Sequence, residues 1–127
     1  MLDALRNLEA WRRACRFSVN VYGLTAHCRE YAYRYQVTRS ALSIASNIAE
    51  GYERETPKDR VRFLYTAKGS CAECWTQLMI GSEAGLVSGD QTRPLIDEAE
   101  QLAKMLRGLI LRFQQQIQEQ SVTSYNP

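Results

Sequence analysis

Two acidic side chains are the first residues whose types could do chemistry. Glu50 and Glu73 could be pictured as a general acid and a general base. Each lies among small polar residues of a helical segment, where a carboxylate more often accepts hydrogen bonds from Ser, Asn or backbone groups. The sequence also lacks a glycine-rich phosphate loop and a nucleophile motif. We therefore expect no catalytic residue and no enzymatic activity.

The four cysteines raise the question of a metal or redox site. Cys71-Ala-Glu-Cys74 has the spacing of a redox or metal-binding pair. The pair falls in the middle of a predicted helix, on its apolar side, and no second pair of this spacing follows. His27 is the only histidine in the chain, so a set of four converging ligands is not available. We expect these cysteines to act as small buried hydrophobes, with no metal and no cofactor.

Glu50 ends one stripe of small polar residues, and Glu73 lies within a second stripe. Within a helix, such residues recur at alternating spacings of four and three, which places them on one side. A solvated helix face would normally use Glu, Lys, Arg or Gln instead. We expect both stripes at close helix contacts, either within one chain or between subunits. The predicted contact residues are Ser40, Ser43, Asn47 and Glu50 in one helix, and Thr66, Ser70, Glu73 and Gln77 in the other.

Basic residues are concentrated in the first third of the chain. The net charge is only +2, but residues 1–45 hold seven Arg against three acidic residues. The face opposite the apolar stripe of the first long helix carries Arg6, Arg12, Arg13 and Arg16, together with Glu9 and Asn20. Arginine suits bidentate contacts to phosphate. We interpret this face either as a site for RNA or DNA or as an ordinary solvated surface.

Aromatic and basic residues are interleaved just before the second long helix. Tyr31, Tyr33 and Tyr35 lie beside Arg29 and Arg34. Such a segment can stack bases and hold phosphates. It can equally cover one end of a helical bundle.

Four amphipathic segments must position these residues. Apolar periodicity predicts helices over residues 8–25, 35–52, 57–84 and 89–118, preceded by a frayed lead-in and followed by a loose tail over 121–127. Thr56-Pro57 marks one helix start, Gly85 marks a helix end at a left-handed position, and Ser88 with Gln91 marks the next start. The last helix carries an apolar seam at alternating spacings of four and three, formed by Leu95, Ala99, Leu102, Leu106, Leu109 and Phe113. Short turns between the helices favour antiparallel neighbours. The predicted fold is all-α: a single domain, 1–127, folded as an up-down-up-down four-helix bundle.

Hydropathy and the N-terminal sequence bear on location. No apolar run approaches the length of a membrane span. The start of the chain lacks the basic-then-apolar layout of a secretory signal. We expect a cytoplasmic protein with no membrane partner.

Two motifs give the chain a family resemblance. Residues 43–51 read Ser-Ile-Ala-Ser-Asn-Ile-Ala-Glu-Gly, and residues 62–70 read Arg-Phe-Leu-Tyr-Thr-Ala-Lys-Gly-Ser, followed by Glu73 and Gln77-Leu78. From about Leu8 to Phe113 the sequence resembles the four-helix-bundle family named for 23S rRNA intervening-sequence proteins. Ala45 stands where the usual pattern has proline, which concerns a possible kink in that helix.

The resemblance implies an all-α bundle that assembles as a ring-like homopentamer. Relatives in this family include the accessory variability determinant of diversity-generating retroelements, a basic pentamer that works with a reverse transcriptase and nucleic acid. We therefore expect a non-enzymatic homo-oligomer that binds RNA or DNA, or that assists a nucleic-acid-processing protein. The alternative is a scaffold or adaptor for other proteins with no nucleic-acid role.

Overall fold

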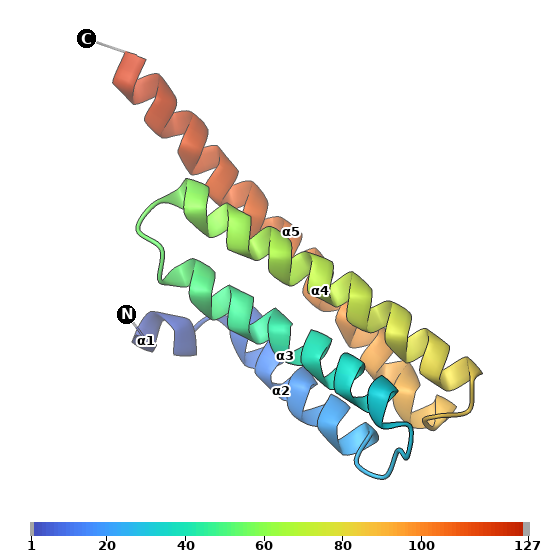
Figure 1. Ribbon diagram of the computed structural model, residues 1–127. Coiled ribbons are helices and arrows are strands. Elements are labelled where there is room, and N and C mark those ends of the chain that lie inside the picture. Colours follow the sequence, from blue (N-terminus) through green and yellow to red (C-terminus); the bar gives the residue numbers. More distant parts are fainter. Residues whose placement is uncertain (1, 126–127) are drawn as a thin grey trace.

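The computed structural model describes residues 2–125, and for residues 123–125 the backbone alone (Figure 1). This part of the chain forms five α-helices and no strand. They are α1 (Leu2–Arg6), α2 (Glu9–Leu24), α3 (Tyr31–Tyr52), α4 (Pro57–Glu83) and α5 (Gly89–Tyr125). The protein is an all-α helical bundle, as predicted. None of the described helices is long and apolar enough to cross a membrane.

Three helix ends form as the local sequence predicts. The Thr56 hydroxyl accepts a hydrogen bond from the Asp59 amide at 3.2 Å, with Pro57 in the first helical position of α4. Gly85 follows α4 with a φ of 74°, which an L side chain rarely adopts. The Ser88 hydroxyl then accepts from the Gln91 amide at 3.3 Å and caps α5. These caps fix where the α4–α5 connection turns.

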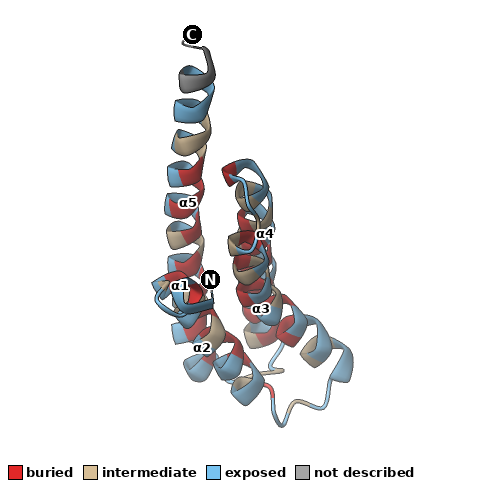
Figure 2. Cartoon of the chain, turned by 90° about the vertical axis from the view of Figure 1, so that its left-hand side faces the viewer, coloured by how far each residue is buried: buried red, intermediate tan, exposed pale blue. Residues whose placement is uncertain are grey.

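The core lies where α2, α3, α4 and α5 face one another. Helix α4 packs against both α3 and α5, while α2 contacts α3 and α5 (Figure 1). Figure 2 shows the buried residues lining the sides of the helices that face inward. The predicted apolar seam of α5 is buried throughout, at Leu95, Ala99, Leu102, Leu106, Leu109 and Phe113. The 3.6-residue period alone was enough to identify it.

The N-terminal segment is ordered as a short helix rather than frayed. Helix α1 covers residues that we expected to be a lead-in. Leu5 is buried against the core, and its carbonyl accepts a hydrogen bond from the Leu8 amide at 3.0 Å. This apolar anchor helps to hold the short helix beside α2.

Helix α3 begins four residues before the expected start at Tyr35. Tyr33 lies inside this first turn, and its hydroxyl donates a hydrogen bond to the Gln77 carbonyl at 2.8 Å. Gly81 lies against the same ring, because a Cβ at that position would come within 1.9 Å of the Tyr33 hydroxyl oxygen. This long-range contact holds the segment as helix, where local sequence had suggested a connection.

Helix α5 continues to Tyr125, beyond the predicted end at Gln118. Residues 121–125 are therefore helical and are not a loose tail, while residues 126–127 lie outside the described residues. The segment from 114 to 120 consists mainly of Gln and Glu, with one Ile and no Gly or Pro. Those are good helix formers, so the helix has no local reason to stop. Its end extends past the other helices (Figure 1).

Candidate nucleic-acid interface

The outer face of α2 carries the predicted basic residues. Burial of Ala10, Ala14, Phe17 and Val21 turns one side of α2 into the core. Arg12 and Arg16 are exposed on this helix, as is Arg6 at the end of α1. We call Arg6, Arg12, Arg13 and Arg16 the α2 basic face.

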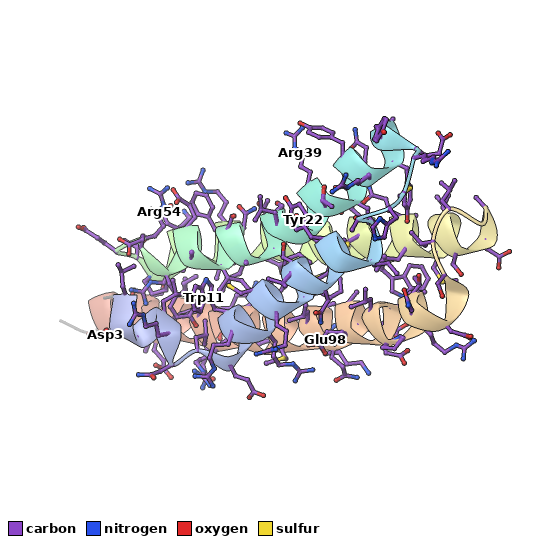
Figure 3. All side chains as sticks on the ribbon, turned by 90° about the horizontal axis from the view of Figure 1, so that it is seen from below. Asp3, Trp11, Tyr22, Arg39, Arg54 and Glu98 are labelled. Carbon is purple, nitrogen blue, oxygen red and sulfur yellow. The ribbon has the colours of Figure 1, made fainter. Side chains whose placement is uncertain are left out.

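Arg13 is tied to the bundle and differs from the other three. Its Nε donates to Glu98 Oε2 at 2.9 Å and its Nη2 to Glu98 Oε1 at 2.5 Å, across from α2 to α5 (Glu98 is labelled in Figure 3). Glu9 lies on its other side, with Nη1 and Oε1 at 3.7 Å. The side-chain hydrogen bond to Glu98 raises the pKa of Arg13 further. Two carboxylates therefore neutralise this arginine, whose role is to join two helices.

The remaining arginines keep most of their donors free. Arg12 Nη1 donates to the Arg6 carbonyl at 2.9 Å and thereby holds α1 against α2. Among the described residues, the guanidinium groups of Arg6 and Arg16 make no hydrogen bond or ion pair. The α2 basic face thus offers three exposed positive charges that no carboxylate of the described chain neutralises. An arrangement of this kind can hold phosphate groups.

The two small polar stripes meet each other within one chain, between α3 and α4. Ser40 Oγ donates to Gln77 Oε1 at 2.6 Å, and the hydroxyl oxygens of Ser43 and Ser70 are 2.9 Å apart. Within α3, Asn47 Nδ2 donates to the Ser43 carbonyl at 2.8 Å and to Ser43 Oγ at 2.9 Å. The partners run in opposite directions along the two helices. We call this contact the α3–α4 polar seam.

The other predicted contact residues border the seam on its solvent side. Glu50 accepts from Arg54 Nη2 at 2.5 Å, Glu73 accepts from Gln77 Nε2 at 3.3 Å, and Thr66 donates to the Arg62 carbonyl at 3.3 Å. Thr66 and Glu73 line a groove of about 390 Å³ beside the seam. The two carboxylates contact different partners and not each other. Each of these bonds stays within one helix or the residues that directly follow it, and Glu50, Thr66 and Glu73 are exposed, so none of the three makes the predicted contact with another helix.

The cysteine pair lies in the core. Cys71 and Cys74 are buried, and loss of hydration raises the pKa of Cys71 to about 12 and that of Cys74 to about 11. Cys74 Sγ lies 3.9 Å from the Val37 carbonyl oxygen. No group of three His, Cys, Asp or Glu side chains in the described part of the chain could hold a metal ion. Both thiols remain protonated near neutral pH and pack as small hydrophobes.

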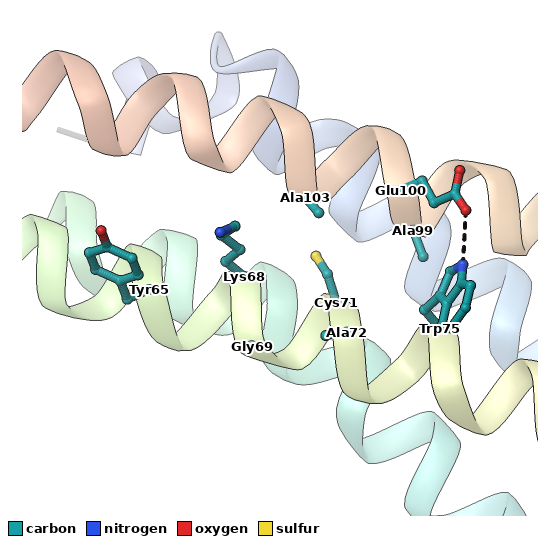
Figure 4. Close-up of a pocket in the computed structure, with 9 residues that line it drawn as sticks. All are labelled: Tyr65, Lys68, Gly69, Cys71, Ala72, Trp75, Ala99, Glu100 and Ala103. Atoms are coloured by element: carbon teal, nitrogen blue, oxygen red, sulfur yellow. Dashed lines mark hydrogen bonds between the residues drawn. The ribbon is translucent and has the colours of Figure 1, made fainter.

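Sequence reasoning missed an apolar groove between α4 and α5. Its volume is about 430 Å³, and small residues including Gly69, Ala72, Ala99 and Ala103 form its walls (Figure 4). Trp75 stands at one end of it and donates from Nε1 to Glu100 Oε1 at 3.1 Å. The available signal was the presence of small residues on facing helices, but one helix alone does not show which residues its neighbour presents.

A second missed feature is a set of arginine–aromatic contacts at the α3–α4 connection. Arg54 Cζ lies 4.6 Å from the centre of the Phe63 ring, and Arg60 Cζ lies 5.5 Å from that of Phe113. Arg60 Nε also donates to the Arg54 carbonyl at 2.9 Å. These arginines are held by rings and backbone, so they stabilise one end of the bundle.

The fold and this surface define a helical-bundle protein with a basic outer helix. Its sequence matches the family model described as 23S rRNA-intervening sequence protein over residues 6–108. Because that match spans most of the chain, the protein belongs to the 23S rRNA-intervening sequence protein family. The predicted family is confirmed.

A solved structure supports the fold. It is the crystal structure of a protein of unknown function from the S23 ribosomal protein family of Bacteroides thetaiotaomicron. The two chains are 20% identical and superpose with a TM-score of 0.75, over 80% of this chain and 97% of the other. At that identity the similarity concerns the fold alone. A search among curated proteins found no match.

Proposed function

We propose that this protein is a non-enzymatic, cytoplasmic homo-oligomer that binds RNA or DNA through the α2 basic face, or that presents nucleic acid to a processing protein. The observation that carries the proposal is the set of exposed guanidinium groups on Arg6, Arg12 and Arg16. No carboxylate in the described chain pairs with them, whereas Glu98 and Glu9 pair with Arg13. The planar guanidinium group matches the geometry of phosphate oxygens and can bind them in a bidentate manner.

The proposed assembly is a ring-like homopentamer of antiparallel up-down-up-down four-helix bundles. The opposed order of partners along the α3–α4 polar seam supports antiparallel packing of α3 and α4. The family resemblance supplies the number of subunits. A ring would repeat three free arginines in every subunit, so weak phosphate contacts would add through avidity.

Two measurements on the wild-type protein test this proposal. Light scattering at micromolar concentration should give the mass of an oligomer, with five subunits expected. Anisotropy titrations with labelled RNA and DNA should show binding at low salt that weakens steeply toward physiological salt, with little dependence on sequence. A monomer would contradict the assembly, and absence of binding even at low salt would contradict the nucleic-acid role.

The alternative function is a scaffold or adaptor that binds another protein and no nucleic acid. The apolar groove between α4 and α5 favours it, because an exposed groove of this kind fits an amphipathic helix. A pull-down from the native host, with and without nuclease, separates the two functions. Partners that remain after nuclease treatment favour the adaptor, and partners that are lost favour the nucleic-acid role.

A further inference from the structure

Three tyrosines near the start of α3 have different structural roles. Tyr33 points toward α4, with its hydroxyl bound to the Gln77 carbonyl and its ring against Gly81. Tyr31 and Tyr35 are 74% and 59% exposed and contribute nothing to the core. A single exposed ring is ordinary, but exposed aromatic rings that lie together can form a contact surface for a partner.

The two exposed rings lie on one face of α3. They are four residues apart, which corresponds to a rise of about 6 Å along the helix axis. Arg39 follows after another four residues, with its Cζ 5.9 Å from the centre of the Tyr35 ring and its Nη1 3.4 Å from the Tyr35 hydroxyl. Figure 3 shows Arg39 at the outer edge of α3. The order along this face is therefore ring, ring and guanidinium.

The charge around these rings is positive. Arg29 and Arg34 flank Tyr31, and their guanidinium groups make no hydrogen bond or ion pair with the described residues. Glu30 is the acidic residue within this stretch of chain. On the neighbouring helix, Glu73 shares a groove with Arg39 and accepts a hydrogen bond from Gln77. The three arginines near the rings therefore outnumber the two nearby carboxylates, Glu30 in the same segment and Glu73 across the groove.

We infer that Tyr31 and Tyr35, with Arg29, Arg34 and Arg39, form a stacking platform for single-stranded nucleic acid. Aromatic rings can stack with any base, and the arginines complement the charge of the phosphates between them. A duplex hides its base faces, so the rings add nothing to duplex binding. This inference rests on the proposed function and extends it by naming the class of nucleic acid and a second contact surface.

The test compares a labelled oligo(dT) single strand with a DNA duplex of equal length, at low salt. The double variant Tyr31→Ala/Tyr35→Ala should lose at least tenfold in affinity for the single strand and less than about twofold for the duplex. Tyr31→Phe/Tyr35→Phe should bind like the wild type, because stacking needs the ring and not the hydroxyl. Tyr65→Ala, which removes another half-exposed tyrosine on α4, is the matched control and should also bind normally.

Each other outcome overturns the platform. Equal losses for single strand and duplex, or unchanged binding by the alanine variant, would show that the rings do not stack on bases. A change in oligomeric mass in the alanine variant would make these tyrosines a subunit contact. If Arg12→Gln/Arg16→Gln weakens all binding while the tyrosine variant changes nothing, the proposed function stands and the platform fails. If the wild type binds neither probe, both fail.

Discussion

The α3–α4 polar seam and the α2 basic face are both built from polar side chains, but only the seam satisfies them internally. In the seam, Ser40 bonds to Gln77 and Ser43 lies in hydrogen-bond contact with Ser70. On α2, Arg13 finds a carboxylate partner, whereas Arg16 finds none in the described chain. Polar groups that the chain satisfies itself serve the fold, and groups that it leaves free are available to a partner. The two regions should therefore respond to mutation in opposite ways.

The largest expected effect is on stability, from placing a charge in the seam. Ser70 is buried, so Ser70→Arg forces a guanidinium into a close helix contact. We expect a loss of about 3 kcal/mol or more in the free energy of unfolding, measured by urea denaturation. Thr66→Arg, one turn earlier and exposed, should change it by less than about 0.5 kcal/mol. Equal stability of both variants would mean that the seam is not closely packed.

The contact between Gly81 and Tyr33, close to the Gln77 end of the α3–α4 polar seam, should be almost as sensitive to substitution. In Gly81→Ala, the new methyl group overlaps the Tyr33 hydroxyl, so the ring must move and its bond to the Gln77 carbonyl breaks. We expect a loss of about 1–3 kcal/mol by the same measurement. Gly69→Ala is the matched control, because no atom lies within 4 Å of its Cβ position. That change should be neutral or stabilising by up to about 1 kcal/mol.

Alkaline pH should weaken the bundle through its buried thiols. Burial raises the pKa of Cys71 and Cys74 above the ordinary value of 9.0, to about 12 and about 11. The folded thiols stay protonated while the unfolded ones ionise. Their contribution to the free energy of unfolding is therefore fully present below pH 9 and is lost as the pH rises above it. By pH 10 we expect a loss of about 1 kcal/mol per thiol. Denaturation at pH 8, 9 and 10 measures this loss, and the Cys71→Ala/Cys74→Ala variant should show a much flatter dependence.

Substitution of Arg13 should lower stability, as substitutions in the α3–α4 polar seam do, although Arg13 lies on α2. Arg13→Gln breaks the pair with Glu98, whose side chain is only 26% exposed. We expect a loss of about 1 kcal/mol in the free energy of unfolding, because the pair is partly open to solvent. Arg16→Gln should change it by less than about 0.5 kcal/mol. A double-mutant cycle with Glu98→Gln isolates the pair, and additive effects would contradict its structural role.

The sequence alone predicted the features that depend on local residue chemistry and on the helical repeat. The buried seam of α5, the Thr56 cap and the left-handed Gly85 all follow from short stretches of residues. The small polar stripes predicted a helix contact, but only the fold shows that they meet each other within one chain.

Features that join distant residues could not be predicted. Arg13 and Glu98 are 85 positions apart, so the basic face appeared to hold four free charges when one is tied. The early start of α3 depends on Tyr33 reaching Gln77, 44 positions away. Helix α1 is held by Leu5, which belongs to the buried core, and by the bond from Arg12 of α2 to the Arg6 carbonyl. Each of these needs the positions of neighbouring helices, which local periodicity does not supply.

The salt dependence of nucleic-acid binding tests the central claim most directly. Arg12→Gln/Arg16→Gln removes two unpaired charges per subunit, and glutamine keeps the helix propensity. In anisotropy titrations between low and physiological salt, this variant should stay folded and oligomeric, bind more weakly, and show a shallower plot of log affinity against log salt. Arg13→Gln should keep the wild-type slope, because Glu98 and Glu9 already neutralise Arg13. Identical slopes for wild type and Arg12→Gln/Arg16→Gln, or a shallower slope for Arg13→Gln alone, would contradict the account.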